Sequence, residues 1–536
     1  MSITKLLKSI FIYTTLMVVV LVGGLFWMTA NDRAIDYEVD IAGIEVPTFS
    51  EQIINYVPTY DAEQSLPFTA SAIIDIDGDG VEELFLGGGI HQADAFFQFK
   101  NGSFVDITSQ TNWHKDTPDK TFGSVALDLD KDGDTDMLIA RQSGVWLYDN
   151  LGGTFVGRKL DLDFDSKSVP LSIAVADLNR DGLFDMYVAG YIARKHVEGE
   201  TIFNQVYGGV SALYINQGNN SFKNVTKESG LYYQHNTFQG IFIDIDGDSL
   251  EDLVVVHDTG TVKTWKNLGN LKFKDMPNPT SDYFSYPMGI AVTDYNNDGS
   301  PDFYFSNVGS TPPDALVRGD LTDDQILHKK WIMFENKGGF RFEDIADKAR
   351  LADYEFSWGA LFEDFNLDGR DDLVVSENYV GFPTHAIPAW RLDGRFMIQN
   401  QNGEFAAVGK AAGVQNRHFG ITPLTADFNQ DGYPDLIHVN LMGPQKVFIS
   451  NGGDANYLKV KLANSVESIG AKVTVVLANG EKRHKTFVIG EGLFSDQTHI
   501  LIFGLGSQHA TDVSVKYLNG QVSNTSGTFV NQVLSL

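Results

Sequence analysis

The stretch Asp75-Ile-Asp77-Gly-Asp79-Gly80-Val-Glu-Glu83 decides the fold, because its pattern occurs seven times along the chain. In chain order, loops 1 to 7 begin at Asp75, Asp128, Asp177, Asp244, Asp294, Asp364 and Asp427. Each loop has acids or amides at positions 1, 3, 5 and 9, and all but loop 4, which has Ser249, carry glycine at position 6. Apolar, β-branched runs lie on both sides of each turn, which is typical of a β-hairpin.

The side chains at positions 1, 3, 5 and 9, with the backbone carbonyl at position 7, form a predicted set of metal ligands. All are hard oxygens, and their clustered negative charge favours Ca²⁺ over Mg²⁺. One such turn alone would be interpreted as a solvated β-turn, but seven concordant copies predict about one Ca²⁺ per loop, up to seven. The predicted ligands are Asp75, Asp77, Asp79, Val81 and Glu83; Asp128, Asp130, Asp132, Asp134 and Asp136; Asp177, Asn179, Asp181, Leu183 and Asp185; Asp244, Asp246, Asp248, Leu250 and Asp252; Asp294, Asn296, Asp298, Ser300 and Asp302; Asp364, Asn366, Asp368, Arg370 and Asp372; and Asp427, Asn429, Asp431, Tyr433 and Asp435.

An EF-hand begins with a similar loop, but it needs a bidentate glutamate at position 12 and a helix on each side. Position 12 holds no acid in any of the seven copies. The residues there are Leu86, Ile139, Val188, Val255, Phe305, Val375 and His438. Because the flanking segments also have strand character, the EF-hand is excluded.

A second hairpin follows several loops, with an Asn/Gly turn before an alternating run, as in Asn101-Gly-Ser-Phe104. Each repeat therefore holds four strands, which is one blade of a β-propeller. The predicted fold is all-β, with a seven-bladed propeller over residues 67–455. Only three strands are evident between Gly420 and Gly452, so part of residues 36–56 is expected to supply the outer strand of the last blade.

Residues 456–536 lack the Asp loops and carry short alternating strands such as Tyr457-Leu-Lys-Val-Lys-Leu462, which predicts a small β-sandwich-like domain. The order of Ile469-Gly470-Ala471 and Gly490-Glu-Gly-Leu-Phe-Ser495 resembles the ASPIC and UnbV domain. The resemblance departs at Tyr517-Leu-Asn-Gly520, where that family usually has Trp-Pro-x-Gly.

The Asp loops and the Asn-Gly-Phe hairpins resemble the FG-GAP or VCBS-type repeats of integrin α-subunit propellers. They are more similar still to the cartilage acidic protein family, in which such propellers precede an ASPIC and UnbV domain. The resemblance covers roughly residues 45–455 and implies a calcium-binding adhesion or interaction module. The chain has no Cys-rich EGF-like tail, so a role tied to such a tail is not carried over.

The N-terminal region predicts export. Lys5 and Lys8 precede an uncharged stretch over residues 10–30, which at 1.5 Å per residue matches the hydrocarbon core of a bilayer. The two lysines place the N-terminus in the cytoplasm and the bulk of the chain outside, in the periplasm or at the cell surface. The expected layout is a cytoplasmic segment at 1–9, a signal anchor or transmembrane helix at 10–30, a linker with the closing strand at 31–66, the propeller at 67–455 and the C-terminal domain at 456–536. Cleavage after the apolar stretch, giving a secreted protein, is the alternative.

Composition narrows the classes of function. The 70 acidic and 40 basic residues give a formal charge of −30, which disfavours nucleic acid as a partner. There is no cysteine, so disulfides, zinc–thiolate sites and cysteine nucleophiles are excluded. The chain has no HExxH, Gly-x-Ser-x-Gly or dinucleotide motif, and the lone histidines His91, His385 and His418 predict no catalytic centre.

Two functions remain open. The first is a binding module for a protein or glycan partner, and the second is an extracytoplasmic polysaccharide lyase or hydrolase built on a calcium-stabilised propeller. Insertions at residues 191–210, 307–332 and 378–396 are either surface decoration or a partner-binding face.

Overall fold

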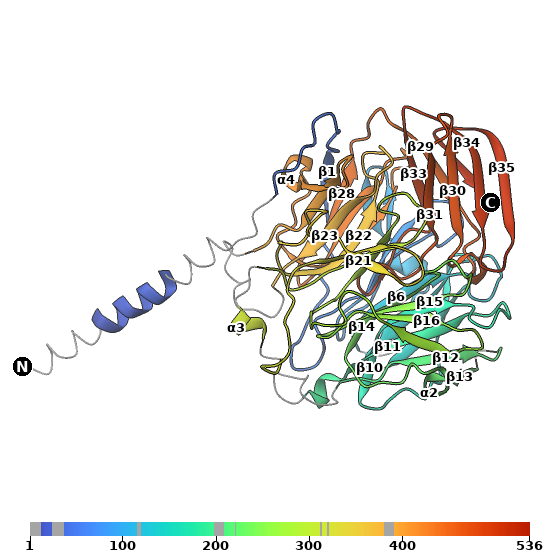
Figure 1. Cartoon of the computed structure of the whole chain (residues 1–536). Coiled ribbons are helices and arrows are strands. Elements are labelled where there is room, and N and C mark those ends of the chain that lie inside the picture. Colours follow the sequence, from blue (N-terminus) through green and yellow to red (C-terminus); the bar gives the residue numbers. More distant parts are fainter. Residues whose placement is uncertain are drawn as a thin grey trace, which may run out of the picture.

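The computed structural model describes residues 12–23, 37–114, 119–197, 208–219, 221–310, 314–318, 321–379 and 391–536. Strands make up most of the regular structure in these ranges, with short helical turns such as α2 (Thr226–Ser229) and α4 (Gly409–Ala412) between them. The predicted all-β class is therefore confirmed (Figure 1).

In the described residues, the repeats fold into seven sheets, each with four antiparallel strands, and the strands of each repeat follow in sequential order. The first sheet has β32 (Ser495–Asp496) as an added fifth strand. The second strand of each sheet starts at the position-9 acid of its Asp loop, so every loop joins a first strand to a second strand. The sheets are β2 (Ser71–Ile74), β3 (Glu83–Leu86), β4 (Ala95–Lys100) and β5 (Ser103–Asp106); β6 (Thr121–Leu127), β7 (Asp136–Arg141), β8 (Gly144–Asn150) and β9 (Phe155–Lys159); β10 (Ser168–Ala176), β11 (Asp185–Ile192), β12 (Ala212–Asn216) and β13 (Phe222–Asn224); β14 (Thr237–Ile243), β15 (Asp252–His257), β16 (Lys263–Asn267) and β17 (Phe273–Met276); β18 (Ile290–Thr293), β19 (Asp302–Phe305), β20 (Ile332–Asn336) and β21 (Phe342–Asp344); β22 (Ser357–Glu363), β23 (Asp372–Glu377), β24 (Arg395–Gln399) and β25 (Phe405–Ala407); and β26 (Phe419–Ala426), β27 (Asp435–Leu441), β28 (Gln445–Ser450) and β1 (Phe49–Ile54).

The first strands of neighbouring sheets pack against one another. Strand β2 contacts β6, β6 contacts β10, β10 contacts β14, β18 contacts β22, and β22 contacts β26. Ile243 at the end of β14 and Ile290 at the start of β18 share one buried apolar cluster. Strand β26 contacts β2, so the last sheet meets the first and the series of sheets closes on itself.

An N-terminal strand completes the last sheet. Strand β1 pairs antiparallel with β28, with Phe49 opposite Ser450, and takes the outermost place. Phe49 is buried, and its ring packs edge-on against Phe365 and Phe396 at centroid distances of 6.1 and 5.7 Å. The segment that closes the last sheet thus also binds the sheet before it.

Replacing Phe49 with alanine is expected to lower the free energy of unfolding by about 3–5 kcal/mol, the usual cost of deleting a buried phenylalanine ring. Chemical denaturation followed by tryptophan fluorescence measures it. The control is Ile53→Ala on the same strand, because Ile53 is 52% exposed and should change stability little. Equal effects of the two changes would mean that β1 does not hold the last two sheets together.

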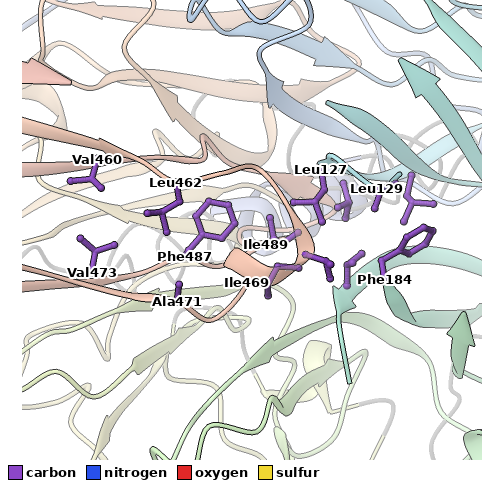
Figure 2. Packing of buried hydrophobic residues seen from close by; sticks show 14 of the residues in the cluster. Leu127, Leu129, Phe184, Val460, Leu462, Ile469, Ala471, Val473, Phe487 and Ile489 are labelled. Carbon is purple, nitrogen blue, oxygen red and sulfur yellow. The ribbon is translucent and has the colours of Figure 1, made fainter. Parts of the chain in front are cut away.

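The C-terminal domain consists of two sheets. One contains β33 (Ile500–Gly506), β29 (Asn456–Lys461) and β36 (Gln532–Ser535), and the other β31 (Lys482–Thr486), β30 (Lys472–Leu477), β34 (Ala510–Lys516) and β35 (Val522–Phe529). Its apolar core is continuous with that of the repeats. Figure 2 shows Val460, Leu462 and Phe487 of the domain in one cluster with Leu127 and Leu129 of the second repeat.

Residues 487–499, here called the inner loop, run from β31 to β33 and lie among the first strands of the sheets. Strand β32 (Ser495–Asp496) within this loop pairs in parallel with β2. Gly492 and Ile290 of β18 exchange two backbone hydrogen bonds, of 3.0 and 2.9 Å. The Asp496 carboxylate accepts the Ala126 N–H of β6 at 2.8 Å, and the Gln497 side chain accepts the Thr425 N–H of β26 at 3.2 Å. The domain is therefore built into the repeats and is not a tethered module.

The described part of the N-terminal region is a helix over residues 12–23, which stands apart from the sheets in Figure 1. Its apolar side chains, such as Leu16 and Val20, are exposed. Among the described residues, no helix has both the length and the apolar character needed to cross a membrane. The predicted transmembrane helix over residues 10–30 is thus not supported, and residues 10–11 and 24–30 of that prediction lie outside the described ranges.

Candidate metal centres and the domain interface

All seven Asp loops share one backbone arrangement. In each, the N–H of position 6 donates to the carboxylate of position 1, at distances from 2.7 Å in loop 7 to 3.2 Å in loop 1. This bond requires a sharp turn with positive φ at position 6, which the glycines supply. Ser249 of loop 4 adopts the same conformation, with φ 68°. The turn is therefore set by the backbone and is the same in all seven copies.

The acid at position 9 joins three segments of its sheet. One of its carboxylate oxygens accepts the N–H of loop position 2 in every loop. In loops 2 to 7 the other oxygen accepts an N–H at the end of the third strand, as from Asn267 to Asp252 at 2.8 Å. Burial raises the pKa of Asp252 to about 8 and that of Asp136 to about 7. Position 9 thus has a structural role besides its predicted one as a ligand.

Loops 1, 2 and 4 bring three carboxylates close enough to hold one ion. Asp75, Asp77 and Asp79 of loop 1 have carboxylate oxygens within 4.8 Å of one another, and the same holds for three acids in each of loops 2 and 4. The trios are Asp128, Asp130 and Asp136 in loop 2, and Asp244, Asp246 and Asp248 in loop 4. In loops 1 and 4, a buried oxygen of Asp75 and one of Asp246 accept no hydrogen bond. Because a buried carboxylate oxygen without a partner is costly, loop 1 fits a bound Ca²⁺. In loop 4 the Lys266 ammonium contacts the other oxygen of Asp246 and the carboxylate of Asp248, so an ion there would compete with this lysine.

Loops 3, 5, 6 and 7 have asparagine at position 3, and their polar groups satisfy one another. The Asn179 amide donates to Asp181 at 2.9 Å, and the same bond occurs in the other three loops at 2.9–3.2 Å. The N–H of position 5 donates to the position-1 carboxylate in each of the four. These loops carry less charge than loops 1, 2 and 4 and need a cation less strongly.

The C-terminal domain covers the end of the sheets at which the Asp loops lie. The Asp128 N–H of loop 2 donates to the Asn464 carbonyl at 2.8 Å, and the Gly506 N–H donates to the Leu367 carbonyl of loop 6 at 2.9 Å. The Lys461 ammonium lies 3.1 Å from the Asp75 carboxylate of loop 1. The sequence did not predict this docking, because these three contacts join residues more than 100 positions apart.

A buried group of charges lies at the same interface. Lys485 of β31 contacts Glu363 at 2.7 Å and Asp371 at 3.1 Å. Beside them, Glu491 of the inner loop accepts the Val292 N–H at 2.6 Å, and burial raises its pKa to about 8. The cavity among these groups measures about 80 Å³, which leaves room for a few water molecules. In the sequence Lys485 belongs to a basic run that is typical of a solvated strand, so no signal indicated this cluster.

Of the three histidines considered from sequence, His91 is exposed, His418 is half-buried, and His385 lies outside the described residues. Another histidine of the chain has a strongly lowered pKa. His438 of β27 is buried, and desolvation lowers its pKa to about 3, with the nearby Lys446 adding to the effect.

Acidification is expected to destabilise the protein through His438. Between pH 6.5 and its folded-state pKa of about 3, this imidazole takes up a proton only when the chain unfolds, so stability falls as pH falls. At pH 5.5 the loss is about 1.4 kcal/mol relative to pH 7.5, from the difference between the unfolded and folded pKa values. Denaturation of wild type and His438→Phe at both pH values measures it, with the exposed His91→Gln as control. An unchanged pH dependence in His438→Phe would contradict the assignment.

Comparison with known proteins agrees with this architecture. The FG-GAP-like repeat matches residues 75–139, 128–188 and 244–305, and the ASPIC and UnbV domain matches residues 462–536. The chain thus contains FG-GAP repeats followed by an ASPIC and UnbV domain, which confirms the resemblance drawn from the Asp loops.

The chain is also similar to curated relatives at low identity. The chain is similar to Cartilage acidic protein 1 of Mus musculus, with 24% identity over 59% of this chain and 47% of that protein, so it spans about half the length of this relative. The Xenopus tropicalis protein is 24% identical over 92% of this chain and 70% of its own length, and the Homo sapiens protein 22% over 95% and 71%.

Among solved structures, a BBS1N chain in complex with ARL6DN has a TM-score of 0.41 at 9% identity, covering 75% of this chain and 98% of its own. Aleuria aurantia lectin has a TM-score of 0.34 at 8% identity, covering 64% and 95%.

Proposed function

We propose that this chain is a seven-bladed, calcium-loaded β-propeller that acts outside the cytoplasm as an adhesion or interaction module for a protein or glycan. Each of the seven sheets of the repeats would be one blade, with its Asp loop as the candidate calcium site. The unpaired buried oxygens of Asp75 and Asp246 and the FG-GAP repeats support calcium. The apolar stretch after Lys5 and Lys8 supports export.

The proposal is carried by a difference between the two ends of the sheets: one end is covered by the C-terminal domain and the other is not. The C-terminal domain covers the Asp-loop end, which leaves the opposite end for a partner. The connections between second and third strands lie at that opposite end, because consecutive connections in an antiparallel sheet alternate between ends. The described parts of the three insertions belong to these connections, including Arg194–His196 after β11 and Asp314–Val317 after β19. Long connections on one end of a rigid scaffold are a usual place for binding.

The test is binding of the purified full chain to an array of glycans and to candidate extracellular proteins, with calcium and with chelator. We expect calcium-dependent binding that Lys195→Glu weakens, because Lys195 is exposed in the connection after β11. The matched control is Lys516→Glu, an exposed lysine of the C-terminal domain, which should leave binding unchanged. Cleavage of a polysaccharide in place of stable binding would favour the lyase or hydrolase.

A further inference from the structure

Strand β29 presents two different faces. Leu458 and Val460 point into the core of the C-terminal domain and are fully buried. Because side chains alternate along a strand, Tyr457, Lys459 and Lys461 share the other face, which lies on the repeats. Residues two apart on a strand are about 6.6 Å apart, so one strand can reach two neighbouring loops. Lys461 meets loop 1, and Lys459 meets loop 7.

Loop 7 holds Lys459 tightly. The Lys459 ammonium contacts the carboxylate of Asp427, the position-1 acid, and the two side chains are only 8% and 3% exposed. On the same strand, the Tyr457 ring packs over Gly432 so closely that a Cβ there would lie 1.9 Å from a ring carbon. The strand is thus seated on loop 7 with the ammonium enclosed.

Both carboxylate oxygens of Asp427 also accept backbone hydrogen bonds. One accepts the Asp431 N–H at 3.1 Å, and the other accepts the Gly432 N–H at 2.7 Å in addition to the lysine. Asp75 of loop 1 differs, because one of its oxygens is buried without a hydrogen-bond partner. Lys461 at loop 1 is also 37% exposed and is free to turn toward solvent. Loop 1 therefore has a buried carboxylate oxygen available to a metal ion, whereas in loop 7 an enclosed ammonium already holds the position-1 acid.

We infer that Lys459 is the resident cation of loop 7, so that the C-terminal domain takes the place of calcium in this loop. Lys266 also contacts Asp246 and Asp248 of loop 4, but its side chain is 23% exposed and so is less enclosed than that of Lys459. The inference rests on the proposed calcium function and refines it, since it sets the greatest number of bound ions at one fewer than the number of Asp loops. A buried ammonium needs its carboxylate partner. A divalent ion in the same loop would therefore have to displace the ammonium. In loop 7, Lys459 thus links the C-terminal domain to the repeats.

Native mass spectrometry of the purified full chain, titrated with Ca²⁺ from mild detergent, counts the ions bound at saturation. We expect Lys459→Met to bind one ion more than wild type, because loop 7 then becomes available. Lys461→Met, the matched control on the same face of β29, should bind the same number as wild type. Adding Asp427→Asn to Lys459→Met should return the count to the wild-type value.

A second pair of variants keeps Lys459 in place, in case Lys459→Met does not fold. Asp427→Asn alone should leave the ion count unchanged, whereas Asp75→Asn should lower it by one. An equal count in wild type and Lys459→Met, or the loss of an ion in Asp427→Asn, would overturn the inference. Binding of no calcium by any variant would overturn the calcium proposal itself, and the inference with it.

Discussion

Replacing Phe494 with alanine is expected to destabilise the whole molecule and not the C-terminal domain alone. Phe494 belongs to the inner loop and is 1% exposed. Its ring lies 4.7 Å from that of Phe68, just before β2, and 6.2 Å from that of Phe238 in β14. Loss of a buried phenylalanine ring costs about 3–5 kcal/mol. Because the ring packs among side chains from the repeats, the repeats should lose this stability too.

Calorimetry and chemical denaturation of wild type and Phe494→Ala measure the effect. We expect one cooperative transition in both proteins, displaced to lower temperature in the variant. Val522→Ala is the control within the same domain, since Val522 of β35 is 58% exposed and should change stability by less than about 0.5 kcal/mol. Two separate transitions, with only the smaller one moved by Phe494→Ala, would show that the domain and the repeats fold independently.

Removing calcium is expected to lower the free energy of unfolding by as much as Phe494→Ala does, or by more. An ion that binds only the folded chain stabilises it by about 2.7 kcal/mol per site at a concentration 100 times its Kd. Loops 1, 2 and 4, whose acids are most crowded, should together lose about 8 kcal/mol in chelator on this basis. Thermal unfolding in calcium and in chelator gives the difference, and Mg²⁺ should restore less of it, because it prefers a smaller octahedral shell.

A single variant separates ion binding from general charge effects. Asp132 of loop 2 accepts the Asp134 N–H at 2.9 Å, which an asparagine oxygen can also accept. Asp132→Asn should therefore lower the melting temperature in calcium and leave it nearly unchanged in chelator. The exposed Asp161→Asn outside the loops is the control. Equal melting temperatures of wild type with and without calcium would refute the proposed role of the ion.

Much of the architecture could be predicted from the sequence. The spacing of the seven Asp loops and the alternating runs beside them define repeated hairpins, because turn chemistry and strand period are local properties. The missing fourth strand after Gly420 also indicated that a strand had to come from the N-terminal region, and β1 occupies that place. Both inferences count strands and do not require the position of any side chain.

What only the tertiary structure decided is how the C-terminal domain uses the repeats. The alternation in β29 shows that Leu458 and Val460 are buried, but it leaves Tyr457, Lys459 and Lys461 looking like an ordinary solvated face. The same holds for Glu491 and Phe494, whose loop could equally have been a surface turn. Burial of a charge depends on a partner of opposite sign, and for Lys459 that partner, Asp427, is supplied by a loop of the repeats. Local pattern fixes the strand period, whereas only the folded chain brings the lysine and its carboxylate together.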